Sequence, residues 1–438
     1  MKGKNILFVL LMALPAMLFT SCLKDDDEVF DEASSQRMQK YLNEAKAALR
    51  SAENGWVMDY YVGDDQVYGG YAFLVKFDSL TCTAASENIT TPCTSYYKLT
   101  TDNGPTLTFD SYNEVLHELA TPSSGNYEGY HADFEFVIMS ATQSEVVLKG
   151  KKTGNRMVLR PLSESMDSYL AKVKSIQDGM SVDKAIGKID TTTVNVNFDM
   201  EGRQYELVCP YDTAENVSGA FTFTDKGIRL YEAVSVEGKT VSEFAFDSAT
   251  KRFTCLDEGS SDIVLDGFVP VDYRPYEAYA GDYYLVYQVA DENDNYQDAR
   301  SEVTLVPSED GKNYLMKGLN SNYDVLLTYN RFKGCLDWNT QIIGVDGANY
   351  IWMNAANFAG GGSLYPAAAE TGMRSSWNMD EQNPVYEWSS NDSELIVSDS
   401  WCLWKTDASG NSLGQVQDSK WAMDGYIVLL YVKSLEKR

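Results

Sequence analysis

The sequence predicts a mainly β (α+β) protein in which an N-terminal helix packs on an antiparallel sheet or partly closed barrel, followed by further antiparallel β domains. Short runs rich in Tyr, Thr and Val alternate apolar and polar residues, which is the period of a half-buried strand. Proline is sparse, at 11 of 438 residues, whereas tyrosine is abundant at 29. Helical periodicity is confined to two segments, residues 31–53 and 162–187.

Residues 31–161 are expected to form the first domain, beginning with the helix of residues 31–53. Its apolar side chains recur at helical spacing, at Met38, Tyr41, Leu42, Ala45, Ala48, Leu49 and Ala52. Asn54-Gly55 is typical of the left-handed end of a helix. From Trp56 the period changes to two residues, and strand-like runs continue to residue 160.

The second half begins with a helical connection over residues 162–190, in which Gly179 ends an apolar stripe. Strand-like runs then predict a middle β domain over residues 191–274 and a C-terminal β domain over residues 275–438. Hairpins of similar length recur without a fixed period, so the pattern does not predict a solenoid or a propeller.

The chain opens with a segment typical of a lipoprotein signal peptide. Two lysines precede an apolar run over residues 6–19, which is too short to span a bilayer as a mature helix. The small pair Thr20-Ser21 then precedes Cys22, and this order resembles the lipobox of bacterial lipoproteins. The resemblance implies that residues 1–21 are removed and that Cys22 is diacylated. The alternative is an ordinary signal peptide with a chance cysteine.

An acidic tether over residues 22–30 follows the cleavage site. It contains a lysine and an acidic run, Lys24, Asp25, Asp26, Asp27 and Glu28. This run resembles the signal that sends Bacteroidetes lipoproteins across the outer membrane to the cell surface, and two acyl chains give stable anchoring. We therefore expect an outer-membrane, lipid-anchored protein at the cell surface. The alternative is a solvated tether on a protein that faces the periplasm.

The charge of the chain excludes one class of partner. Without residues 1–21 the chain keeps 34 basic and 64 acidic side chains, a formal charge of −30. Binding to nucleic acid through phosphates needs a basic surface, so we expect no nucleic-acid partner.

Six cysteines remain after Cys22, and an oxidising compartment permits disulfides among them. Only Cys82 and Cys93 are close in the sequence, on either side of a Thr/Ser/Pro-rich turn. They are the one candidate disulfide. No CxxC pair is present, which argues against a structural zinc site of that type.

Four stretches of the N-terminal half carry a resemblance to a known family: Ser51–Trp56, Gly69–Tyr71, Phe109–His117 and Gly150–Met157. Through them this half resembles a family of Bacteroidetes lipoproteins defined as domain of unknown function 4302. The family carries no activity. Its members tend to be encoded near outer-membrane importers of the starch-utilisation type. The resemblance therefore implies a role in uptake, with a TonB-dependent importer and its lipoprotein partner as candidate partners.

The sequence offers few catalytic candidates. The two histidines, His117 and His131, match no zinc-peptidase helix motif. Gly410–Gly414 matches the G-x-S-x-G pattern of serine hydrolases, but its flanks are polar turn residues and both histidines lie upstream. We therefore predict a hairpin loop there, and neither a cofactor nor a catalytic residue is assigned.

One segment has the spacing of a calcium loop. Asp291, Asn293, Asn295 and Glu302 occupy its positions 1, 3, 5 and 12, although Tyr296 stands where the loop needs glycine. A solvated hairpin rich in Asp and Asn is the favoured interpretation, and no metal site is assigned.

Tryptophans are concentrated in the last part of the chain, at Trp338, Trp352, Trp377, Trp388, Trp401, Trp404 and Trp421. Sugar rings stack on flat aromatic faces, and rigid aromatic side chains lose little entropy on binding. The alternative is that most of these side chains fill the core. Strand alternation puts Trp401 and Trp404 on opposite faces, so that one of them is exposed.

Together these observations favour a non-catalytic lipoprotein that serves as a ligand-binding or accessory component of a nutrient-uptake system, with a glycan as one candidate ligand. The alternatives are a hydrolase that uses a carboxylate pair and an adhesion or scaffold protein. Acidic residues are too numerous for their spacing to identify such a pair. A cleft with two facing carboxylates would favour the hydrolase, whereas a flat aromatic face would favour binding.

Overall fold

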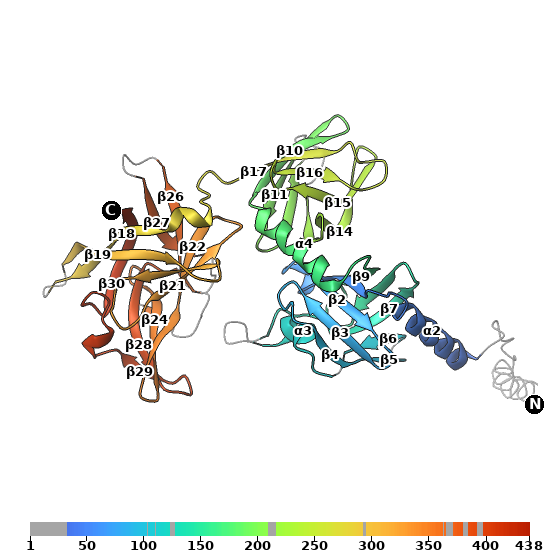
Figure 1. Cartoon of the computed structure of the whole chain (residues 1–438), viewed down its shortest axis with the longest axis horizontal. Helices are drawn as coiled ribbons and strands as arrows, with labels where there is room; N and C mark the ends of the chain where they lie inside the picture. Colours follow the sequence, from blue (N-terminus) through green and yellow to red (C-terminus); the bar gives the residue numbers. More distant parts are fainter. Residues whose placement is uncertain are drawn as a thin grey trace, which may run out of the picture.

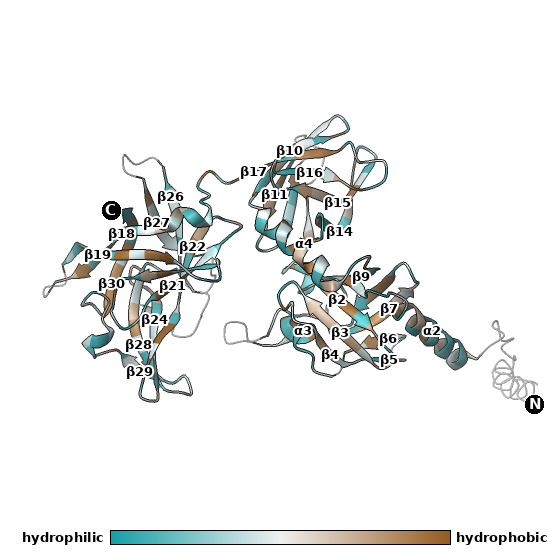
Figure 2. Cartoon of the chain, viewed as in Figure 1, coloured by the Kyte–Doolittle hydropathy of each residue, from teal (hydrophilic) through white to brown (hydrophobic). Residues whose placement is uncertain are grey.

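A computed structural model describes residues 33–102, 104–109, 111–122, 128–208, 216–291, 295–361, 363–364, 371–379, 384–391 and 397–438. It confirms a mainly β protein, built from three successive antiparallel β units (Figure 1). Figure 2 shows apolar residues gathered along the strands of all three units. The N-terminal signal and tether, with Cys22, Lys24, Asp25, Asp26, Asp27 and Glu28, lie outside the described residues.

The N-terminal unit is a nine-stranded sheet with the order β4-β3-β2-β1-β9-β8-β7-β6-β5. The strands are β1 (Trp56–Tyr61), β2 (Gly70–Phe77), β3 (Thr81–Ser86), β4 (Cys93–Tyr96), β5 (Lys98–Thr100), β6 (Thr106–Thr108), β7 (Glu135–Ala141), β8 (Val146–Gly150) and β9 (Arg156–Pro161). Only Tyr97 separates the edge strands β4 and β5 in the sequence, so the two edges lie close together. The sheet is therefore rolled into a nearly closed barrel, as predicted.

The long helix α2 (Ser34–Leu49) packs against this sheet through Leu42, Ala45, Ala48 and Leu49. The indole N–H of Trp56 donates to the carbonyl of Leu49 at 2.7 Å and ties the helix end to β1. Short helical turns complete the unit at η2 (Asp64–Gln66), α3 (Glu114–His117) and η3 (Glu118–Ala120). The helix is shorter than the predicted span of residues 31–53, and Gly55, with φ of 88°, lies in the turn into β1.

Helix α4 (Met166–Gly179) connects the first two units and lies between them in Figure 1. Ser165 caps it by accepting a hydrogen bond from the Ser168 N–H. The sequence predicted a helical connection that continues to residue 190, and this extension is wrong. Lys184–Ile189 form the first barrel strand, β10, because they pair with strands on both sides.

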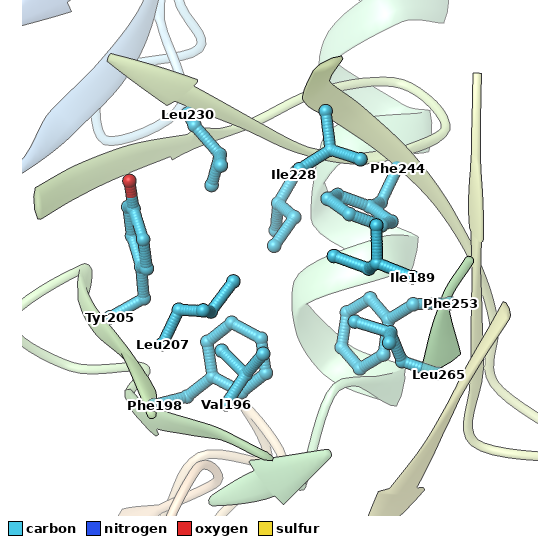
Figure 3. A pocket seen from close by; sticks show the side chains of 11 residues that line it. Ile189, Val196, Phe198, Tyr205, Leu207, Ile228, Leu230, Phe244, Phe253 and Leu265 are labelled. Atoms are coloured by element: carbon cyan, nitrogen blue, oxygen red, sulfur yellow. The ribbon is translucent and has the colours of Figure 1, made fainter. Parts of the chain in front are cut away.

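The middle unit is a closed barrel of eight antiparallel strands in sequence order. The strands are β10, β11 (Thr192–Asp199), β12 (Gln204–Val208), β13 (Val217–Phe223), β14 (Gly227–Val236), β15 (Lys239–Asp247), β16 (Arg252–Cys255) and β17 (Val264–Phe268). The barrel closes because β17 pairs with β10. Its interior is filled by apolar side chains, including Val196, Phe244, Phe253 and Leu265, and leaves a void of only about 20 Å³ (Figure 3). A barrel of this size is often filled by its own side chains.

Two arginines, the buried Arg203 and the largely buried Arg229, join the barrel to the N-terminal sheet. Arg203, in the turn between β11 and β12, pairs with the carboxylate of Glu87 and donates to the carbonyl of Gly70 at 2.6 Å. Its guanidinium lies 3.8 Å from the ring centre of Tyr71. Arg229 of β14 bridges Asp59 of β1 and Glu243 of β15, with both N···O distances at 2.9 Å. Buried charges are tolerated only when paired, so these networks fix how the two units meet.

The C-terminal unit is a 13-stranded sheet in which eight strands close into a ring, because β18 also pairs with β30. The ring strands are β18 (Gly281–Ala290), β19 (Tyr296–Pro307), β20 (Asn313–Lys317), β21 (Val325–Asn330), β22 (Cys335–Asn339), β26 (Gly372–Asn378), β27 (Val385–Ser390) and β30 (Val428–Lys437). The turn η4 (Tyr276–Tyr279) precedes the ring.

A side sheet extends from β30. It contains β28 (Ser400–Thr406), β24 (Asn349–Asn357) and β23 (Gln341–Asp346), with the short strands β25 (Ser363–Leu364) and β29 (Ser412–Gln415) and the turn η5 (Ser419–Trp421). Its inner face, with Ile351, Met353 and Leu403, packs on the core of the ring. The ring meets the barrel where Phe332 stacks on Phe223, with ring centres 5.9 Å apart.

Candidate functional site

The seven clustered tryptophans divide into a core group and a surface group. Trp338 and Trp401 are fully buried and stack at 4.6 Å between ring centres, and Trp388 and Trp421 are also buried. The alternative interpretation of the sequence, that most of these tryptophans fill the core, is therefore confirmed for four of the seven. The remaining three, Trp352, Trp377 and Trp404, are only partly buried.

Strand alternation places Trp401 and Trp404 on opposite faces of β28, as predicted. Trp401 is 0% exposed and faces the core, whereas Trp404, three residues later on β28, lies on the outer face of the side sheet. The register places Trp404 directly opposite Trp352 of β24. Ile342 of β23 pairs with Trp352 on its other side, and Gln415 of β29 pairs with Trp404. We call these four residues the outer tryptophan row.

Hydrogen bonds to neighbours on the same sheet hold the two indoles of this row. The N–H of Trp352 donates to the hydroxyl of Thr406 at 3.0 Å, and the N–H of Trp404 donates to the hydroxyl of Ser412 at 2.9 Å. Exposed Ile342 and Leu413 extend the apolar surface beside them. An indole fixed along a sheet offers one flat face outward, the geometry on which a sugar ring stacks.

Trp377 belongs to a separate pocket of about 250 Å³ at one end of the ring. We call it the Trp377 pocket; its lining is Arg274, Ala278, Tyr283, Trp377, Pro384, Tyr386, Leu435 and Lys437. The rings of Trp377 and Tyr386 pack at 4.7 Å between centres. The guanidinium of Arg274 lies 4.4 Å from the centre of the Trp377 ring. No carboxylate is among these lining residues.

A larger cleft of about 500 Å³ lies between α4 and the C-terminal ring, and it contains three carboxylates. Asp178 pairs with Arg331 at 2.7 Å, and Glu201 with Lys333 at 3.4 Å. Hydrogen bonds from Ser308 and from the Lys312 N–H lower the pKa of Asp310 to about 2. A hydrolase needs a carboxyl that stays protonated as its acid, and the lowered pKa of Asp310 does not suit that role.

Each histidine contacts a residue three or four positions before it in the chain. The Nδ1 of His117 lies 3.2 Å from the N–H of Asn113, at the start of α3. His131 has a positive φ of 54°, and its Nε2 lies 2.9 Å from a carboxylate oxygen of Glu128. Across the described part of the chain, no group of three or more His, Cys, Asp or Glu side chains is placed to hold a metal ion.

The two loop motifs form hairpins. Gly410–Gly414 runs from the turn after β28 into β29, where Ser412 accepts the hydrogen bond from Trp404. Asp291 accepts a hydrogen bond from the Asn295 N–H at 2.9 Å in the turn between β18 and β19, and Asn293 lies outside the described residues. Glu302 is displaced along β19, opposite Tyr284, so it does not reach the turn as a calcium ligand would.

The predicted disulfide between Cys82 and Cys93 is not formed, and both are free thiols. Strands β3 and β4 do pair, but Cys82 stands opposite Ser95 and Cys93 opposite Ala84. The two cysteines are therefore diagonal neighbours, which are roughly 7–8 Å apart and too far for a disulfide without movement of the backbone.

We expect cysteine reactivity to follow burial. Burial raises the pKa of Cys82, Cys255 and Cys402 to about 11 and that of Cys335 to about 12, and the thiolate is the reactive form. Among the five cysteines that the structure describes, partly exposed Cys93 should therefore react first with iodoacetamide in the native protein. Peptide mass spectrometry measures the order. Protection of both Cys82 and Cys93 until a reductant is added would instead show that they form the disulfide.

The helices give no membrane-spanning candidate: none of those in the described residues is long and apolar enough to cross a bilayer.

Comparisons with known proteins give families without an assigned activity. A family model described as Domain of unknown function (DUF4302) matches residues 26–248, just over half of the chain, and a second, DUF4987, described as Domain of unknown function, matches residues 256–404. No curated protein matches. A crystal structure of the beta subunit from DNA polymerase of Streptococcus pyogenes covers 75% of this chain and 96% of its own at 10% identity, but the TM-score of 0.09 supports no inference. The match over residues 26–248 shows that the chain belongs to the DUF4302 family.

Proposed function

We propose that this protein is a lipoprotein anchored through Cys22 in the outer membrane, displayed at the cell surface, and that it binds glycans for a nutrient-uptake system without catalysing a reaction. The outer tryptophan row is the observation on which the glycan-binding role rests. The anchoring rests on the resemblance of residues 1–28 to a lipoprotein signal and surface-export sequence.

The row suits a carbohydrate for three reasons. Its two tryptophans stand directly opposite each other on paired strands, so both lie on the same face of the side sheet. Their N–H groups are already bonded to Thr406 and Ser412, so the rings are held in place before a ligand arrives. Gln415 borders Trp404 and offers both a donor and an acceptor to sugar hydroxyls.

The two alternatives have less support. A hydrolase with a carboxylate pair would need one carboxyl kept protonated in a cleft. In the cleft beside α4, the pKa of Asp310 is lowered, and Asp178 and Glu201 are engaged in ion pairs. An adhesion or scaffold role would be consistent with tandem β units, but it does not account for the outer tryptophan row.

Affinity electrophoresis in gels that contain neutral polysaccharides tests the binding role. We expect the protein to be retarded by at least one polysaccharide of the panel. Trp352→Ala and Trp404→Ala should each weaken that binding by about tenfold, because buried aromatic side chains dominate binding energy. Tyr112→Ala is the matched control, since it removes an aromatic side chain that is 72% exposed on the N-terminal unit. Equal retardation of all variants would overturn the role of the row.

Isolation of the tagged protein from native outer membranes, in mild detergent, tests whether it is anchored there as part of an uptake complex. We expect a TonB-dependent importer and its lipoprotein partner to co-purify in fixed ratio, and Cys22→Ala to release the protein from the membrane fraction. Recovery of the protein alone would argue against the uptake complex. Complete resistance to protease on intact cells would argue against surface display.

A further inference from the structure

The Trp377 pocket lies at the mouth of the C-terminal ring, apart from the outer tryptophan row. Trp377 of β26 pairs with Tyr386 of β27, which in turn pairs with Leu435 of β30. Lys437 lies two residues beyond Leu435 on the same strand, and strand alternation therefore puts it on the same face. The mouth of a β-barrel is a common place for a small-molecule site.

The pocket is positively charged in a strongly acidic protein. The chain carries a formal charge of −28, and most of its described arginines form ion pairs. Arg274 and Lys437 are different, since neither forms an ion pair with any of the residues that the structure describes. Two cations that face an uncharged aromatic wall attract an anionic group.

The stacking of Arg274 leaves it able to bind such a group. Its guanidinium carbon lies over the Trp377 ring, and its Nη1 donates to the carbonyl of Tyr273 at 3.1 Å. A guanidinium has five N–H donors in its plane, so its edge keeps donors for two parallel hydrogen bonds to a carboxylate. Stacking and edge binding do not compete, because they use different parts of the group.

The other residues that line the pocket determine the size and shape of the uncharged part of the ligand. Tyr386 and Leu435 are nearly fully buried and form an apolar floor, and Trp377 provides a flat wall. The volume of about 250 Å³ lies below the usual range for drug-sized ligands, so it fits a single ring.

We propose that the Trp377 pocket binds a small six-membered ring that carries one carboxylate, with the carboxylate at Arg274 and Lys437 and the ring against Trp377 and Tyr386. Such a ring is supplied by a hexuronic acid or by an aromatic acid. The proposal goes beyond the binding of neutral glycans and uses different residues.

Isothermal titration calorimetry with sodium glucuronate, sodium benzoate, glucose and sodium acetate tests the proposal. We expect glucuronate or benzoate to bind at millimolar concentrations or below, with glucose and acetate at least about tenfold weaker, because each lacks one of the two recognised parts. The relative affinities of glucuronate and benzoate distinguish the two sources of the ring.

Arg274→Gln should weaken the binding of the preferred acid by about tenfold or more, since it removes the charge and the paired donors. Arg274→Lys keeps the charge but not the fork, so it should give an intermediate loss, and it keeps the test informative if Arg274→Gln fails to fold. Arg300→Gln is the matched control on β19, because Arg300 pairs with Glu436 outside the pocket.

Absence of heat with both acids, equal affinity for glucose and glucuronate, or unchanged affinity in Arg274→Gln would each overturn the proposal. Neutral polysaccharides test binding at Trp352 and Trp404, whereas the carboxylates test binding at Arg274. A negative result for one site therefore leaves the result for the other site unaffected.

Discussion

Replacing Arg203 by methionine is expected to lower the free energy of unfolding of the N-terminal sheet and barrel by about 3–5 kcal/mol, the usual cost of leaving a buried charge without its partner. The guanidinium pairs with Glu87, bonds the carbonyl of Gly70 and stacks on Tyr71. Methionine fills a similar volume without these interactions. Urea-dependent hydrogen exchange in peptides from β1–β3 and β11–β13 measures the change.

Arg252→Met is the matched control, because the pair of Arg252 and Asp266 lies in solvent, with side chains 53% and 61% exposed. It should change stability by at most about 1 kcal/mol. In the double variant Glu87→Gln/Arg203→Met, most of the lost stability should return, because no unpaired charge remains buried. Equal losses in Arg203→Met and Arg252→Met would show that the buried pair does not hold the two units together.

The effect of Arg203→Met should also depend on pH. Burial raises the pKa of Glu87 above its usual value of 4.5, an effect that Arg203 opposes, so loss of Arg203 raises this pKa further. A carboxyl with a higher pKa in the folded state binds more protons when folded, and stability therefore falls as pH rises through that pKa. The deficit relative to the parent protein should be largest at neutral pH and smallest near pH 4.5. A deficit that is independent of pH would contradict this role of Glu87.

Trp401→Ala is expected to lower the free energy of unfolding of the C-terminal unit by about 3–5 kcal/mol, the range for removing a large aromatic side chain from a core. Trp401 is 0% exposed and stacks on Trp338, so its loss leaves a cavity between the side sheet and the ring. Urea unfolding followed by tryptophan fluorescence measures it, since seven of the eight tryptophans lie in this unit.

The control for this substitution lies three residues along the same strand. Trp404→Ala removes the same side chain from the outer face, where it should cost about 1 kcal/mol. Similar losses for the two variants would contradict the assignment of Trp401 to the core and Trp404 to the surface.

The fold class could be predicted because alternation and helical spacing are local properties. The closure of the two barrels could not, since nothing within Lys184–Ile189 or Val428–Lys437 indicates which distant strand each will meet. The run Lys184–Ile189 is short and lacks a clear alternation, so its local pattern does not distinguish it from the helix that precedes it. The spacing of Cys82 and Cys93 suggested a bridge, but the register of β3 and β4 decides the distance between them.

The candidate site was predictable in part. Composition identified the tryptophans, and alternation separated Trp401 from Trp404. The pairing of Trp404 with Trp352, and the stacking of Arg274 on Trp377, depend on strands and segments far apart in the sequence. An arginine in a linker carries no local signal that it will stack on an indole, and only the three-dimensional structure shows it.

The contact between β18 and β30 makes the completion of the C-terminal ring depend on two strands that lie far apart in the sequence. The ribosome releases β18 long before β30, so β18 waits without one of its two neighbours until residues 428–437 emerge. Pairing over so long a stretch of chain is slow, and an unpaired strand edge invites association with other molecules. Until the two strands meet, β18 keeps one open edge, and early contacts of the C-terminal unit with other molecules should concentrate there.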